Sequence, residues 1–173
     1  MKSLKLNSYS PEQTKLLGSH LGELVQEGDV FLLVGKLGTG KTCLVQGIAH
    51  GLGIKEYAFS PSFIIVREYY GRLPLYHIDF YRLDHIKEIA DLGLEEYLYG
   101  NGLCVVEWAE KGLQVLPQKN LLITLNYALS CETERIISLK PQGDHYLELV
   151  RQLEFNLDKE NHGVSHRYFF QYC

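Results

Sequence analysis

The sequence predicts an α/β fold with one mostly parallel sheet, antiparallel additions to that sheet, and helices on both of its faces. Two segments, 30–34 (VFLLV) and 103–107 (LCVVE), are apolar almost throughout, with no alternation of polar and apolar residues. This pattern is typical of parallel strands that are covered on both sides. The length of 173 residues favours a single domain around one hydrophobic core.

The first helix is predicted from its start signals. Residues 2–9 can form a short leading strand, after which Ser10 suits an N-cap and Pro11 a first helical position. Gln13 can return a hydrogen bond, as in a capping box. A Gly-Asp pair ends the helix just before the first apolar strand. The apolar stripe recurs at helical spacing and consists of Leu16, Leu17, Leu21, Leu24 and Val25.

A second helix and a hairpin are predicted next. The glycines Gly51 and Gly53 close the helix. Residues 63–70 (FIIVREYY) and 73–80 (LPLYHIDF) flank a Gly-Arg turn, and we expect them to pair as a hairpin. The apolar face of the helix is formed by Leu44, Val45, Ile48, Ala49 and Leu52.

Short elements fill most of the remaining chain. Asp84 can cap a short helix, and 93–98 (GLEEYL) suggests another. Two further strands, 121–127 (LLITLNY) and 135–140 (RIISLK), are joined by a polar turn. A last amphipathic helix is predicted from the spacing of Tyr146, Leu149, Val150 and Leu153.

Residues 1–155 form the predicted domain, and residues 156–173 are assigned to a C-terminal tail of unknown structure because they show no clear period. The chain is 46% hydrophobic and 22% charged, as in ordinary globular proteins. Its net charge of -4 argues against wrapping of nucleic acid and against a polybasic membrane anchor. Any link to RNA would therefore run through a partner protein or a local patch.

The sequence lacks the features of an exported or membrane protein. The first thirty residues contain no signal-peptide pattern, and no run approaches the ~18 apolar residues that span a bilayer. We therefore expect a cytoplasmic protein with no membrane partner. The cysteines are scattered without a CxxC pair, which predicts free thiols at Cys43, Cys104, Cys131 and Cys173.

Residues 35–42 (GKLGTGKT) complete the phosphate-loop (P-loop) pattern GxxxxGK[ST]. The glycines Gly38 and Gly40 let the backbone curl so that successive amides face inward. A helix that begins near Lys41 adds the positive end of its dipole at the same point. Lys41 reaches the β- and γ-phosphates, and the Thr42 hydroxyl is suited to Mg²⁺. A chance match in a glycine-containing turn is disfavoured, because a buried strand precedes the loop and an amphipathic helix follows it.

ATP and Mg²⁺ are therefore the predicted cofactors, and the predicted sheet is that of a P-loop NTPase. Lys36 either adds charge near the phosphates or points to solvent, and the sequence does not decide between these two readings. The loop residues expected to bind the nucleotide are Gly35, Lys36, Leu37, Gly38, Thr39, Gly40, Lys41 and Thr42.

Two acids end predicted strands and could serve the metal. Glu107 ends the uniformly apolar segment of a central strand, and Asp79 ends a more amphipathic strand. Both strands would deliver a carboxylate to the sheet edge where the loop lies. We assign Mg²⁺ binding to Thr42 and Glu107, and a supporting role to Asp79 as a water positioner or outer-shell group. The alternative is that either acid merely caps a strand end.

Trp108 and His77 lie beside these acids in sequence. Trp108 is the only tryptophan, and it either packs near the nucleotide or fills the core. Both readings stay open, and we include it among the candidate nucleotide-binding residues. His77 precedes Asp79 by two residues, but a lone HxD is weak evidence for a metal site, because P-loop metal sites favour oxygen ligands. We expect His77 to be structural.

Five motifs together resemble the bacterial TsaE (YjeE) family of small P-loop ATPases. The similarity runs from about residue 10 to about residue 140, and the combination of HxDxYRL with EW is more specific than the loop alone. The motifs, in order, are GKLGTGKT (35–42), SPSF (60–63), YHIDFYRL (76–83), GLEEY (93–97) and VEWAEKG (106–112).

The resemblance implies an accessory role in forming threonylcarbamoyladenosine at position 37 of tRNAs that read ANN codons. In that family the ATPase acts on a complex of TsaD and TsaB, in which TsaD is the transferase, and ATP hydrolysis supports repeated turnover. TsaC supplies threonylcarbamoyl-adenylate. The implied partners of this chain are therefore TsaD and TsaB, with tRNA reached indirectly through that complex.

The resemblance also assigns residues. Lys41 and Thr42 match the phosphate and metal residues of the family, Glu107 its acidic metal residue, and Asp79 the acid of HxDxYRL. Lys41, Asp79 and Glu107 are thus the implied catalytic residues.

Further positions match less specific features of the family. Ser60, Pro61 and Ser62 match a mobile segment that resembles a switch, and Glu12 and Arg135 lie where the family has nucleotide-proximal groups. The chain departs from the family in having Lys36 in place of aspartate and Ser62 in place of threonine.

The predicted reaction is in-line attack of water on the γ-phosphate, with Asp79 helping to orient the water. No obvious arginine finger is present, although Arg82 and Arg67 are candidates, so we expect slow hydrolysis without partners. One alternative is a small-molecule or nucleotide kinase, which needs an acceptor pocket and usually an arginine-rich lid. The other is a non-catalytic assembly module in which ATP has a structural role.

Overall fold

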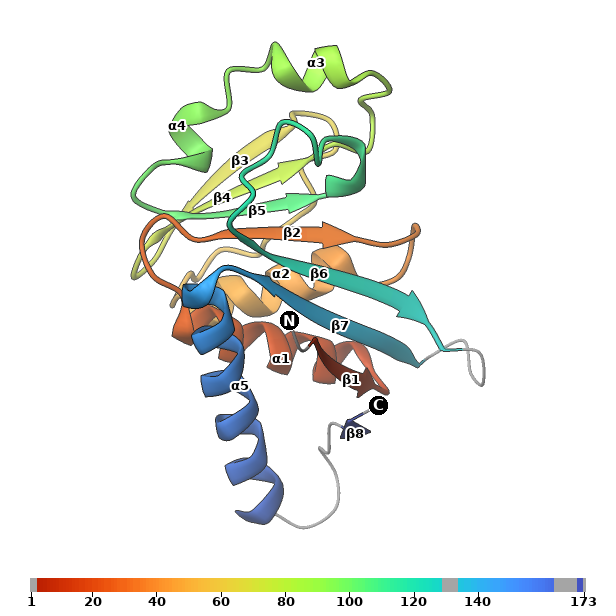
Figure 1. Cartoon of the computed structure of the whole chain (residues 1–173), viewed down its shortest axis with the longest axis vertical. Coiled ribbons are helices and arrows are strands. Elements are labelled where there is room, and N and C mark those ends of the chain that lie inside the picture. The colour runs from red at the N-terminus through yellow and green to blue at the C-terminus, as the bar shows by residue number, and fades with distance from the viewer. Residues whose placement is uncertain (1–2, 129–133, 164–170, 173) are drawn as a thin grey trace.

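One eight-stranded sheet organises the molecule (Figure 1). The structure is a computed structural model that describes residues 3–128, 134–163 and 171–172. Across the sheet, the strand order is β3-β4-β5-β2-β6-β7-β1-β8. The strands are β1 (Leu4–Ser8), β2 (Val30–Val34), β3 (Val66–Tyr70), β4 (Pro74–Asp79), β5 (Leu103–Glu107), β6 (Asn120–Tyr127), β7 (Arg135–Gln142) and β8 (Gln171–Tyr172).

The centre of the sheet is parallel and its two ends are antiparallel. β4, β5, β2 and β6 pair in parallel, whereas β3 pairs with β4, and β6, β7, β1 and β8 pair with one another, in antiparallel fashion. The predicted α/β class, with a parallel sheet extended by antiparallel strands, is confirmed. β2 and β5, the two continuously apolar segments, lie side by side at the centre.

Helices cover both faces of this sheet, as predicted. α1, α2 and α5 pack on the face to which Phe31 and Leu33 point, and α3, α4 and a 3₁₀ turn pack on the face of Val30 and Leu32. Side chains alternate between faces along a strand, so β2 contributes to both hydrophobic clusters. The helices are α1 (Pro11–Leu24), α2 (Lys41–Gly51), α3 (Ile86–Ala90), α4 (Glu95–Leu98) and α5 (Asp144–Gly163), and the 3₁₀ turn is η1 (Ala109–Lys111).

α1 begins as its sequence predicts. The Ser10 hydroxyl accepts a hydrogen bond from the Gln13 N–H at 3.3 Å. The Gln13 side chain in turn accepts one from the Tyr9 N–H at 2.7 Å. The returned bond therefore reaches one residue before the N-cap. The bond from Gln13 satisfies one of the backbone donors that the start of a helix leaves unpaired.

α1 and α2 cross at very short range because glycines line the crossing. A Cβ added at Gly47 would lie 2.0 Å from the carbonyl oxygen of Lys15, and one at Gly51 would lie 2.1 Å from that of Ser19. Gly18 and Gly22 make the same close approach from α1. α2 follows the phosphate loop directly, so this crossing fixes the helix that carries Lys41.

The hairpin of β3 and β4 forms as predicted, but β3 begins later than the sequence suggests. The expected strand started at residue 63, whereas β3 starts at Val66. The carbonyl of Pro61 accepts hydrogen bonds from the N–H groups of Ile64 and Ile65, which closes a turn in place of the strand. Ile65 then adopts a φ of 68°, a region that β-branched residues rarely enter.

The predicted cap of α3 is wrong by one residue. His85, not Asp84, is the N-cap of α3. The carboxylate of Glu88 accepts hydrogen bonds from the N–H groups of Asp84 and His85 at 3.0 and 3.1 Å. The acid that satisfies the start of this helix therefore lies within the helix, not before it.

α5 continues beyond the expected domain boundary at residue 155. It runs to Gly163, because Leu157 extends the buried stripe of Leu149, Val150 and Leu153. Beyond the helix, β8 pairs with β1, so two more residues of the predicted tail join the sheet (Figure 1). The rest of that tail lies outside the described residues.

Cys43 and Cys104 are free thiols, and Cys131 and Cys173 lie outside the described residues. Among the described helices, none combines the length and apolar character that a membrane crossing requires.

Candidate phosphate and metal site

The phosphate loop connects the end of β2 to the start of α2. Gly40 is the N-cap of α2 with a φ of 99°, a left-handed conformation that favours glycine. A Cβ at Gly35 would lie 2.3 Å from the carbonyl oxygen of Leu125, so β6 leaves no room for a side chain there. α2 starts at Lys41, which places the positive end of an eleven-residue helix at the loop.

Two side chains from β6 and β7 hold the loop from its outer side. The Tyr127 hydroxyl donates to the Leu37 carbonyl at 3.0 Å, and Arg135 Nε donates to the Thr39 carbonyl at 3.1 Å. The guanidinium of Arg135 also lies 4.3 Å from the centre of the Tyr127 ring. In a trans peptide, the C=O and the following N–H point in opposite directions. The N–H groups that follow these two carbonyls belong to Gly38 and Gly40. They therefore point away from the Tyr127 and Arg135 side chains.

Lys41 is folded back into the loop. Its ammonium donates to the carbonyls of Gly35 and Lys36 at 2.6 and 3.1 Å, and it lies 3.8 Å from the centre of the Trp108 ring. Burial lowers the pKa of Lys41, and the nearby carboxylate of Glu107 partly opposes that shift. A buried cation surrounded by carbonyls and an aromatic face is well placed to exchange those partners for phosphate oxygens.

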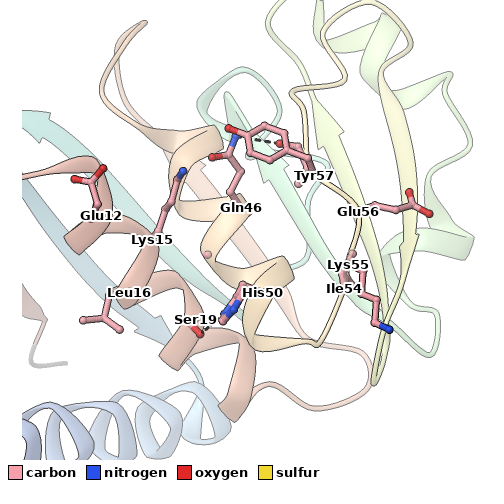
Figure 2. A pocket seen from close by; sticks show the side chains of 12 residues that line it. Glu12, Lys15, Leu16, Ser19, Gln46, His50, Ile54, Lys55, Glu56 and Tyr57 are labelled. Carbon is pink, nitrogen blue, oxygen red and sulfur yellow. Dashed lines mark hydrogen bonds between the residues drawn. The ribbon is translucent and has the colours of Figure 1, made fainter.

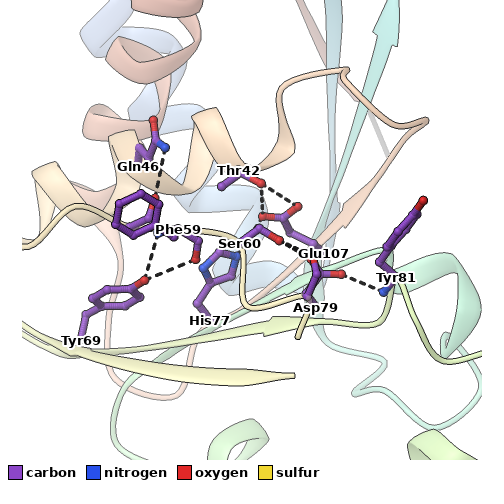
Figure 3. Close-up of polar contacts among 11 residues, drawn as sticks. Thr42, Gln46, Phe59, Ser60, Tyr69, His77, Asp79, Tyr81 and Glu107 are labelled. Atoms are coloured by element: carbon purple, nitrogen blue, oxygen red, sulfur yellow. Dashed lines mark hydrogen bonds and ion pairs between the residues drawn. The ribbon is translucent and has the colours of Figure 1, made fainter. Parts of the chain in front are cut away.

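Glu107 joins the loop to the sheet (Figure 3). The Thr42 hydroxyl donates to Oε1 of Glu107 at 2.8 Å and lies 3.1 Å from Oε2. His77 Nε2 lies 2.9 Å from Oε1 of the same carboxylate. Glu107 is almost fully buried, and the two residues expected to hold Mg²⁺ are thus in direct contact.

Asp79 lies beside Glu107, because the two are paired across the parallel strands β4 and β5. Its Oδ2 accepts hydrogen bonds from the hydroxyls of Ser60 and Ser62, and its Oδ1 accepts one from the Tyr81 N–H at 2.7 Å. Both acids therefore reach the edge where the loop lies, as their strand ends predict. Asp79 also ties the 60–62 segment to that edge.

Trp108 lies at the site and also packs against the hydrophobic cluster on the Val30 and Leu32 face of the sheet. It follows Glu107 with a φ of 57° and is half-buried. Its ring meets the Lys41 ammonium on one side and lies 5.0 Å from the centre of the Tyr81 ring. The ring therefore lines the cavity and contributes to the core, and its contact with a nucleotide stays a prediction.

A cavity of about 480 Å³ lies between the loop, the 60–63 segment and the strand ends. Arg82 lies at its rim, 4.0 Å from the centre of the Phe63 ring, and both residues line the cavity. Among the predicted site residues, those that line it are Leu37, Gly38, Gly40, Lys41, Thr42, Asp79, Glu107 and Trp108.

The other predicted residues do not line this cavity. Lys36 is exposed, and its carbonyl accepts the Thr39 hydroxyl at 2.9 Å. Arg135 supports the loop from outside, as described above. Glu12 lines a separate groove between α1, α2 and the 54–58 segment (Figure 2). Contact of these residues with a nucleotide stays a prediction.

The donor set suits magnesium. A hydroxyl and a carboxylate are in contact at the foot of the loop, and oxygen is the ligand type that Mg²⁺ prefers. In the described part of the chain, no group of three or more His, Cys, Asp or Glu side chains could hold a metal by itself. Thr42 and Glu107 would thus supply the protein side of a site that nucleotide oxygens and water complete.

Two further side chains contact this site, and only one of them carried a signal in the sequence. The sequence offers no signal for Tyr127 as a support of the loop, because the contact joins residues 90 positions apart. His77 did carry a signal, since the period of two in a strand places it on the same face as Asp79. Its ring contacts Glu107, and the structural role expected for it stays a prediction.

Comparisons with known proteins show the family to which the chain belongs. The family model "Threonylcarbamoyl adenosine biosynthesis protein TsaE" matches residues 8–137, which include the loop and both acids. The TsaE of Bacillus subtilis (strain 168) is 43% identical over 154 residues, 88% of this chain and 95% of that protein. The TsaE of Treponema pallidum is 45% identical over 118 residues, 68% of this chain and 87% of that protein. The crystal structure of Bacillus subtilis YdiB superposes with a TM-score of 0.79 at 39% identity, covering 90% of this chain and 96% of that one.

Proposed function

The chain belongs to the TsaE family of threonylcarbamoyladenosine biosynthesis, and on that premise we propose that it binds and hydrolyses ATP with Mg²⁺. The family takes part in forming threonylcarbamoyladenosine in tRNA. Within that pathway, the chain acts as an accessory ATPase on a TsaD–TsaB complex in the cytoplasm. It reaches adenosine 37 of tRNAs reading ANN codons only through that complex.

One observation carries the ATPase part of this proposal. The Thr42 hydroxyl is in hydrogen-bond contact with the Glu107 carboxylate at the mouth of a glycine-rich loop. A helix N-terminus, a buried lysine and a paired hydroxyl and carboxylate together form a site for a triphosphate and its magnesium.

Each residue has a defined task in this mechanism. The loop amides and the start of α2 bind the phosphate oxygens, and Lys41 leaves the carbonyls of Gly35 and Lys36 to pair with them. Mg²⁺, held through Thr42 and Glu107, supplies charge neutralisation when it is bound. Asp79 orients the attacking water once its bonds to the 60–62 segment are released.

Hydrolysis by the isolated chain is slow in this account. Arg82 lines the cavity but stacks on Phe63, and Arg67 lies on β3 and does not line the cavity. Arg82 would have to leave the Phe63 ring before it could act as an arginine finger on the γ-phosphate. Binding of the partner complex would complete the site and raise the rate.

Reconstitution tests the proposal. Threonylcarbamoylation of tRNA by TsaC, TsaD and TsaB is measured with and without this chain, at several ATP concentrations, alongside release of phosphate. We expect repeated turnover only when the chain is present, and Asp79→Ala should abolish it while ATP binding is preserved.

Three results would contradict the proposal. Modification that does not depend on the chain would remove its accessory role. Transfer of phosphate to a nucleoside or sugar in a substrate screen would favour the kinase alternative. Full modification by Asp79→Ala would favour the assembly module, because ATP would then be needed only as a bound ligand.

A further inference from the structure

His77 is a buried side chain with an incomplete set of hydrogen bonds. It lies on β4, fully buried, and its Nε2 is 2.9 Å from Oε1 of Glu107. Its Nδ1 is also buried and has no hydrogen-bond partner among the described residues. An unpaired buried nitrogen costs free energy that an apolar side chain at the same place would avoid. The hydrogen bond to Glu107 is therefore the favourable interaction that an imidazole provides here and an apolar side chain would not.

The strand geometry makes this bond specific. His77 is paired with Val105 across β4 and β5, and Glu107 lies two residues further along β5 on the same face. The carboxylate has only acceptor lone pairs, so the imidazole must donate through Nε2–H. His77 thus holds Oε1 of Glu107 from the sheet side, while Thr42 approaches from the loop side (Figure 3).

The two oxygens of Glu107 are held unequally. Oε1 has two partners, Thr42 at 2.8 Å and His77 at 2.9 Å, whereas Oε2 has Thr42 at 3.1 Å. With Oε1 fixed from two directions, the rotation of the carboxylate is restricted. Oε2 is left with the longer of the two Thr42 contacts, and it is the oxygen more easily turned toward a cation.

We propose that His77 is a positioning residue that orients the Glu107 carboxylate for Mg²⁺ through its Nε2–H bond. The inference rests on the proposed function, because it assumes that Glu107 serves the magnesium of a bound nucleotide. Hydrogen-bond partners of metal-binding residues typically raise metal affinity or activity by about 10–100-fold. His77 acts in this way without touching the nucleotide or the metal itself.

Three variants separate positioning from simple burial. His77→Leu removes the donor while keeping an apolar side chain in the strand. His77→Gln keeps an amide N–H donor at a similar reach and should restore the bond. His20→Gln is the matched control, because His20 is a buried histidine on α1, away from the cavity.

The first measurement uses the metal-free wild-type protein. A ¹⁵N–¹H spectrum of the histidine side chains is expected to show His77 as the Nε2–H tautomer with a hydrogen-bonded proton. An Nδ1–H tautomer would overturn the proposal without any reference to nucleotide.

The second measurement is calorimetric titration with a non-hydrolysable ATP analogue, in Mg²⁺ and in EDTA. We expect His77→Leu to reduce the gain in affinity that Mg²⁺ provides by about 10–100-fold, with the EDTA affinity unchanged. His77→Gln should recover most of the gain, and His20→Gln should match the wild type. In a Glu107→Gln background, His77→Leu should have no further effect, because the two residues act as one unit.

The outcomes distinguish this proposal from the one on which it rests. A full Mg²⁺ effect in His77→Leu, or an equal loss in Mg²⁺ and EDTA, would overturn the positioning role alone. A wild-type protein that binds the analogue with no Mg²⁺ effect would overturn the proposed function and this inference together. If His77→Leu does not fold, the His77 tautomer and the His77→Gln variant test the positioning role. A His77→Gln protein that folds but loses the Mg²⁺ effect contradicts that role, because it keeps an N–H donor.

Discussion

The glycine crossing of α1 and α2 gives a prediction whose size can be worked from the structure. A Cβ built on Gly47 lies 2.0 Å from the Lys15 carbonyl oxygen, 1.0 Å inside the 3.0 Å that real Cβ atoms respect. The obstacle is backbone, so in Gly47→Ala the two helices must separate. Overpacking of this kind costs about 3 kcal/mol, while the better helix propensity of alanine returns about 1 kcal/mol. The free energy of unfolding should fall by about 2 kcal/mol.

Thermal melting followed by circular dichroism measures this change. For a chain of this length, about 2 kcal/mol corresponds to a melting temperature lower by about 4–8 °C. Affinity for Mg²⁺–ATP should fall as well, because Lys41 and Thr42 open the helix that moves. Gly53→Asn is the control, since Gly53 has open space around it and asparagine tolerates its left-handed φ. A Gly47→Ala protein that melts at or above the wild-type temperature would refute the close crossing.

Three further predictions concern the loop and the core. Lys41→Ala should weaken ATP binding by about 100-fold or more, whereas Lys87→Ala, at an exposed position, should leave it unchanged. Equal ATP affinities of Lys41→Ala and the wild type in a titration would contradict the role of Lys41. Arg135→Ala should weaken ATP binding by roughly 10-fold, because the loop loses a charged hydrogen-bond donor to its backbone. The melting temperature should change little. An unchanged ATP affinity would show that the loop keeps its shape without Arg135. Tyr146→Phe leaves the Val30 N–H without its acceptor, which should cost about 1–3 kcal/mol in a urea titration. Burial raises the pKa of Tyr146 from its ordinary value of 10.0 to about 12, so the folded state keeps a proton that the unfolded state releases. The free energy of unfolding of the wild type should therefore fall as pH rises from 10 toward about 12, and the contribution of Tyr146 to this fall should be absent in Tyr146→Phe. Identical dependence of the free energy of unfolding on alkaline pH in the two proteins would contradict this.

The central part of the fold could be predicted because its signals are local. β2 and β5 are continuous apolar runs, and adjacent residues indicate the strand–loop–helix order around 35–42. The ends of parallel strands meet at one edge, so the convergence of Asp79 and Glu107 followed from the order of elements.

Features set by an unrecognised local turn or by distant contacts were missed or misplaced. β3 begins at Val66 because the Pro61 carbonyl closes a turn, although the residues before it have strong strand propensity. The contact of Arg135 with the loop joins residues 96 positions apart, and no local pattern encodes it. α5 runs past residue 155, where Leu157 is buried in the hydrophobic cluster that also contains Leu149 and Leu153, and the polar sequence around Leu157 does not reveal this.

The most direct test is a crystal structure of the chain with a non-hydrolysable ATP analogue and Mg²⁺. We predict a triphosphate wrapped by residues 35–42 and a cation bound, directly or through one water, by the Thr42 hydroxyl and the Glu107 carboxylate. A nucleotide bound elsewhere with this loop empty, or a Glu107 side chain turned away from the cation, would contradict it.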